Sequence, residues 1–147
     1  MRGTAAERFV VINLRLLALG FAVVGILFIA VPNGVLDTIS DLGDSIGSFT
    51  RAPHSEEQLW LALAFSYMVV ITAICLVAQA DVVRYRALLA VLAVGKTASS
   101  LSALGFYVFD QYVFIYLLNF AVDGLLALTA LWLWSLAGRV GRPAEPG

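Results

Sequence analysis

Two neighbouring stretches are long and apolar: ALLAVLAVGKTASSLSALGFYVF, residues 87–109, and VFIYLLNFAVDGLLALTALWLWSLA, residues 113–137. A helix needs about 20 mostly apolar residues to cross about 30 Å of hydrocarbon, and both stretches are long enough. Each contains one charged residue near its middle, Lys96 in the first and Asp123 in the second. Because backbone polar groups must be satisfied internally in lipid, we expect both stretches to be transmembrane helices.

Two further stretches, residues 9–31 and 59–80, have the same apolar character. The whole chain of 147 residues is 61% hydrophobic and 13% charged, whereas soluble domains are about 45–50% apolar and about 25% charged. The first stretch is longer than the apolar region of a signal peptide, so we interpret it as a retained anchor. The sequence therefore predicts an all-α fold, an antiparallel four-helix transmembrane bundle, with residues 1–147 forming a single integral membrane domain.

The distribution of arginine predicts the orientation in the membrane. If the N-terminus is inside, the outer face receives only Arg51. The inner face then receives Arg2, Arg8, Arg84, Arg86, Arg139 and Arg142. Because loops rich in Lys and Arg stay on the cytoplasmic side, we expect a multi-pass protein of the plasma membrane, the bacterial inner membrane, with both termini cytoplasmic.

The outer segment, residues 33–54, has an amphipathic pattern. Apolar residues recur in it at helical spacing: Val35, Leu36, Ile39, Leu42, Ile46 and Phe49. Asp37, Asp41 and Asp44 fall together on the other face. This pattern predicts an amphipathic helix along the outer membrane surface. The three aspartates are either a solvated face or an outer patch for docking a partner or a cation, and their spacing is not that of a calcium loop.

Lys96 and Asp123 are expected to meet. A charge at the bilayer centre costs about 2.5–3.5 kcal/mol, so both side chains should face the protein interior. If the two helices turn near Gln111, reflection places Lys96 opposite Leu126, three residues from Asp123. At 1.5 Å per residue the offset is about 4.5 Å, which a lysine stem can span. We predict an intramembrane ion pair, direct or bridged by water.

The neighbours of this pair are small or polar. Gly95, Ser99 and Ala103 form a ladder of small residues, Ser100 flanks it, and Asn119 lies four residues before Asp123. Small residues allow helix backbones to approach, and hydroxyl and amide groups add hydrogen bonds between helices. The predicted polar cluster contains Lys96, Asp123, Asn119, Ser99 and Ser100. It either fixes helix register, or relays protons or anchors a polar ligand, or pairs with another subunit.

The other two stretches also carry stripes of small residues, which we expect to face the bundle interior. These stripes are Ala18, Ala22 and Gly25 in the first, and Ala62, Ser66 and Ala73 in the second.

No catalytic motif accompanies these features. The sequence contains one histidine and one cysteine, no phosphate-binding glycine loop and no G-x-S-x-G elbow. We therefore assign no catalytic residue, metal site or cofactor. The net charge of −1 argues against a nucleic-acid partner.

The overall plan resembles the DoxX-like group of small bacterial four-helix membrane proteins. The shared features are a basic N-terminus, a first helix closed by Pro32-Asn33-Gly34, an extramembrane insertion and three tightly connected spans. That family includes oxidoreductase-associated subunits, and no catalytic residue carries over to this chain.

Three functions remain open from the sequence. The favoured one is a non-enzymatic subunit or scaffold of a membrane complex, with the lipid bilayer and another membrane protein or a second copy as partners. The alternatives are an oligomeric transporter or channel component that uses Lys96 and Asp123, and a membrane enzyme acting on a lipid or quinone.

Overall fold

The computed structural model describes residues 4–54 and 57–140, and this part of the chain is all-α. Its helices are α1 (Ala5–Ala30), α2 (Pro32–Ile46), α3 (Gln58–Ala78), α4 (Arg86–Phe109) and α5 (Phe114–Ala137). The helices α1, α3, α4 and α5 are long and apolar enough to cross a membrane. The four predicted spans are thus confirmed as helices, with bounds that differ by a few residues, and they fit a small membrane protein.

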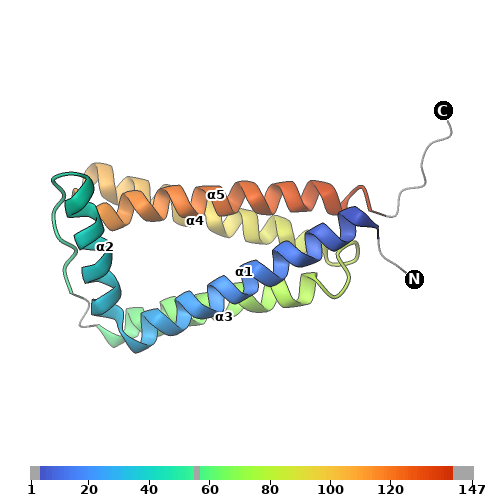
Figure 1. Ribbon diagram of the computed structural model, residues 1–147, viewed down its shortest axis with the longest axis horizontal. Coiled ribbons are helices and arrows are strands. Elements are labelled where there is room, and N and C mark those ends of the chain that lie inside the picture. Colours follow the sequence, from blue (N-terminus) through green and yellow to red (C-terminus); the bar gives the residue numbers. More distant parts are fainter. Residues whose placement is uncertain (1–3, 55–56, 141–147) are drawn as a thin grey trace.

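The long helices form two pairs, α1 with α3 and α4 with α5 (Figure 1). The pairs meet near the two chain ends and diverge toward the opposite end, where α2 runs across from one pair to the other. The buried core lies where the pairs meet. It contains Val10, Leu14, Ala18, Phe21, Ile71, Cys75, Ala78, Val82, Leu89, Leu92, Ala93, Ala130, Leu133 and Ala137.

The change of direction between α1 and α2 follows from Pro32. Val31 closes α1 through a backbone bond to the Leu27 carbonyl and also precedes the first residue of α2. Proline has no N–H with which to continue α1, and its fixed φ suits the first turn of a new helix. The predicted outer segment is accordingly helical from Pro32, and the helix ends at Ile46.

The rest of the outer segment, residues 47–54, is not helical and folds onto the turn between α4 and α5. The Thr50 N–H donates to the Tyr112 carbonyl at 2.9 Å. The Phe49 ring stacks on Tyr112 and packs against Phe114, with both centroid distances 5.1 Å. These contacts fasten α2 to the α4–α5 pair.

Gly43 brings α2 close to the start of α5. A Cβ atom at Gly43 would lie 2.6 Å from the Phe114 Cβ, so the contact leaves no room for a side chain. Gly43 is buried in this contact. A glycine is therefore required at this position by close packing.

Arg86 holds the two helices together at the other end of the α4–α5 pair. Its Nε donates to the Trp134 carbonyl at 2.8 Å, and its guanidinium lies 3.9 Å from the Trp134 ring centroid. A cation at this position satisfies a carbonyl of the last turn and complements the negative end of the helix. Gly138 leaves space for the guanidinium, since a Cβ there would lie 2.6 Å from Arg86 Cζ.

One stripe of small residues does not face the interior as predicted. Ala62, Ser66 and Ala73 on α3 are exposed. The buried residues of α3 include Ile71 and Cys75. The prediction was wrong because small residues allow close packing without determining which helix face packs, and here larger apolar side chains form the contact.

Gly43→Ala should destabilise the protein by about 1–3 kcal/mol, the usual cost of overpacking a tight contact. Gly105→Ala is the matched control, because a Cβ at Gly105 meets nothing within 4 Å. Thermal unfolding in detergent micelles measures both variants. Equal melting temperatures for the two would contradict the contact between α2 and Phe114.

Candidate functional site

Lys96 and Asp123 form a direct ion pair between α4 and α5. The Lys96 Nζ donates to the Asp123 Oδ1 at 2.9 Å. The Lys96 side chain is 2% exposed and the Asp123 side chain 7%. The predicted pairing is confirmed in its direct form, with the lysine stem spanning the offset between the two positions.

The Lys96 ammonium also contacts the other helix pair. It lies 4.8 Å from the ring centroid of Phe21 on α1 and 5.4 Å from that of Tyr67 on α3. The electron-rich face of an aromatic ring attracts a cation, and it does so more strongly where water is excluded. The ammonium, carried by α4, therefore contacts side chains of α1, α3 and α5.

The other predicted polar residues also lie between α4 and α5. The Ser100 Oγ donates to the Phe120 carbonyl at 2.8 Å. The Asn119 Nδ2 donates to the Ser99 Oγ at 3.4 Å. A Cβ at Gly124 would lie 3.2 Å from the Ser100 Oγ, so the helices approach closely here. Lys96 pairs with Asp123, whereas Ser99 and Asn119 form a separate contact on the next turn of each helix.

The fully buried polar side-chain atoms all have partners. Within residues 4–54 and 57–140, every buried side-chain nitrogen or oxygen has a hydrogen-bond partner. A buried polar group without a partner would cost about 1–3 kcal/mol. The ion pair thus lies among buried polar groups that all have partners.

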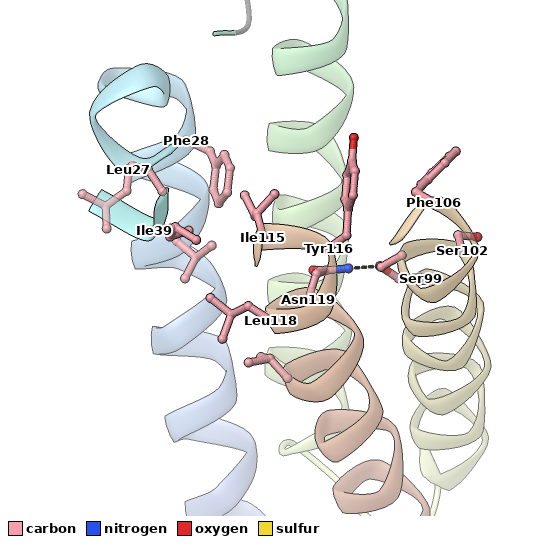
Figure 2. A pocket seen from close by; sticks show the side chains of 14 residues that line it. Leu27, Phe28, Ile39, Ser99, Ser102, Phe106, Ile115, Tyr116, Leu118 and Asn119 are labelled. Atoms are coloured by element: carbon pink, nitrogen blue, oxygen red, sulfur yellow. Dashed lines mark hydrogen bonds between the residues drawn. The ribbon is translucent and has the colours of Figure 1, made fainter. Parts of the chain in front are cut away.

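A cavity of about 530 Å³ lies beside the polar cluster, between the diverging helix pairs. Figure 2 shows Leu27 of α1, Ile39 of α2 and Leu118 of α5 around it, with Ser99 and Asn119 on one wall. Lys96 and Asp123 are not among its lining residues. The sequence did not predict this cavity, because hydropathy shows that helices are apolar but not where two pairs of helices separate.

The three aspartates of α2 contact two side chains that follow the helix, Arg51 and His54. The Arg51 guanidinium lies 2.8 Å from Asp41, 3.0 Å from Asp44 and 3.9 Å from Asp37. The hydrogen bond with Asp41 raises the pKa of Arg51 above its usual value, and the charges of the three carboxylates add to this. The His54 Nε2 lies 3.0 Å from the Asp37 Oδ1.

These carboxylates are not arranged as a metal site. No group of three or more His, Cys, Asp or Glu side chains in the described ranges is placed to hold a metal ion. The sequence predicts that Arg51 lies on the same outer face as the aspartates but does not predict its contact with them. Its position ten residues after Asp41, beyond the end of α2, gave no periodic signal.

The chain was compared with protein-family models, curated proteins and solved structures. No family model, curated protein or solved structure matches it significantly. The resemblance to DoxX-like proteins therefore stays a prediction.

Lys96→Met or Asp123→Leu alone should lower the free energy of unfolding by about 3–5 kcal/mol, because each leaves an unpaired buried charge. The free energy of unfolding of the double variant should be well above that of either single variant, since the double variant removes both charges together. Denaturant titration in bicelles measures the cycle. Thr97→Val is the control, because the Thr97 hydroxyl bonds only to the carbonyl of its own helix. Strictly additive losses would contradict the pairing.

Proposed function

We propose that the chain is a non-enzymatic subunit or scaffold of a membrane complex. In this proposal, residues 1–147 form a single integral membrane domain that crosses the plasma membrane of a bacterium as an antiparallel four-helix bundle. Both termini are cytoplasmic, and α2 lies along the outer surface. The partners are the lipid bilayer and either another membrane protein or a second copy of the chain.

The observation that carries this proposal is the uncovered face of α3. In the apolar window of α3 only 17% of residues are buried, against 33% in that of α4. Its stripe of Ala62, Ser66 and Ala73 is exposed. Helices associate in membranes through such small residues, because they let backbones approach and pack. The face therefore suits another transmembrane helix.

The buried ion pair supports a structural role over transport. Lys96 and Asp123 bond to each other, and neither lines the cavity. A proton relay or a polar-ligand anchor needs access to its ionisable groups. In the proposed function the pair sets the alignment of α4 and α5, and the transporter reading is the weaker alternative.

A lipid- or quinone-directed function is the second candidate, and the cavity between the helix pairs favours it. Most of the cavity lining is apolar, and Ser99 and Asn119 supply polar groups at one wall. Neither residue is a strong acid or base at neutral pH, so the cavity favours binding over catalysis.

A photoreactive benzoylphenylalanine at position 66 should form a discrete protein adduct when native membranes are irradiated. The same residue at position 128 is the control, because Leu128 is 65% exposed on α5 but belongs to no small-residue stripe. The mass of the adduct gives the size of the partner. A second copy of the chain that carries a different tag shows whether the partner is another copy or a different protein. If position 66 yields only lipid adducts, as position 128 should, the subunit proposal fails.

Cysteine labelling in intact cells tests the proposed orientation. Thr38→Cys on α2 should react with a membrane-impermeant maleimide, whereas Arg139→Cys should react only after lysis. Both positions are exposed, whereas the native Cys75 is fully buried and should not react with the maleimide. The reverse pattern would place the termini outside and contradict the positive-inside assignment.

A further inference from the structure

The cavity between the helix pairs is accessible from the apolar surface of the protein. Its rim includes Val24 on α1, 38% exposed, and Val122 on α5, 46% exposed. Its volume of about 530 Å³ falls within the range of about 300–1,000 Å³ typical of small-molecule sites. A ligand dissolved in the membrane can therefore enter from the side.

One wall of the cavity offers unused hydrogen-bonding capacity. A carboxamide can donate two hydrogen bonds and accept two. Asn119 makes one, as donor to Ser99, and no group in the described residues donates to its oxygen. In Figure 2 the Asn119 nitrogen points toward Ser99, and its oxygen lies on the opposite side. The smaller hollow between α1 and α3 differs, because the hydroxyl of Thr72 in its lining is bonded to the Met68 carbonyl.

The cavity contains no charge that would hold an ionic head group. None of its lining residues is Asp, Glu, Lys or Arg. The nearby Lys96 ammonium is already bonded to Asp123. Transfer of an unpaired phosphate or carboxylate into such a site would be strongly unfavourable.

We propose that this cavity binds a neutral lipid whose head is a hydroxyl group. The chain of the lipid lies among the apolar residues of α1, α2 and α5. Its hydroxyl donates to the Asn119 carboxamide oxygen, the acceptor that the protein leaves without a donor. This site does not depend on the subunit role, because it uses the gap between the helix pairs and not the exposed face of α3.

The test uses the full chain in phosphatidylcholine nanodiscs with a diazirine-bearing hexadecanol as the probe. Its methyl ether is the matched compound, because it keeps the chain and the oxygen but has no O–H to donate. Irradiation followed by peptide mapping should place the hexadecanol label on cavity residues. Labelling by the ether should be about fivefold weaker, the worth of one neutral hydrogen bond.

Three variants test whether the weaker labelling by the ether depends on Asn119. Asn119→Leu should lower hexadecanol labelling to the level of the ether, whereas Asn13→Leu should leave it unchanged, because Asn13 bonds to the Phe9 carbonyl away from the cavity. Ala103→Phe narrows the cavity while the Asn119 side chain is kept, and it should reduce labelling by both compounds. Melting temperatures of all variants show whether each is folded.

Three results would overturn the proposal. Equal labelling by the alcohol and the ether would exclude recognition of the hydroxyl. Labels spread over the exposed helix faces would indicate ordinary contact with bulk lipid. Competition by dioleoyl phosphatidate as strong as competition by unlabelled hexadecanol would show that a charged head is accepted.

Discussion

Hydrocarbon does not tolerate an isolated charge, and this constraint determines how the second half of the chain is arranged. Lys96 and Asp123 each lie near the middle of an apolar helix, where an unpaired charge is costly. They meet at 2.9 Å with almost no exposure. This contact requires α4 and α5 to be aligned along their length and rotated toward each other. The Phe21 and Tyr67 rings then connect the ammonium to α1 and α3.

The two ends of the molecule are held in different ways, and the difference creates the cavity. Where the helix pairs meet, a continuous apolar core holds them together, and the contact of Arg86 with Trp134 holds α4 to α5. At the other end α2 lies across the gap, with Gly43 against Phe114. The helices do not close on each other there. The open space is lined mostly by apolar side chains, with the amide of Asn119 and the side chains of Ser99, Ser102 and Tyr116.

The sequence predicted those features that follow from hydropathy and helical geometry. Four apolar helices, the helix after Pro32 and the Lys96–Asp123 pair could all be inferred, because the cost of burying polar groups leaves few alternatives. The inward orientation of Ser66 was predicted wrongly, since a small side chain fits either a helix interface or an exposed face. No pattern in the sequence predicted the cavity or the contact of Arg51 with Asp37, Asp41 and Asp44, because both depend on how separate segments are placed in space.

The pairing of Lys96 with Asp123 can be tested by measuring the distance between their side chains in lipid. Solid-state NMR on protein in bilayers, with ¹⁵N at the Lys96 side chain and ¹³C at the Asp123 carboxyl group, reports their dipolar coupling. A strong coupling, as required by an Nζ–Oδ1 contact of 2.9 Å, is the predicted result. A coupling too weak to detect would show that the two groups are apart in the membrane and would contradict the account.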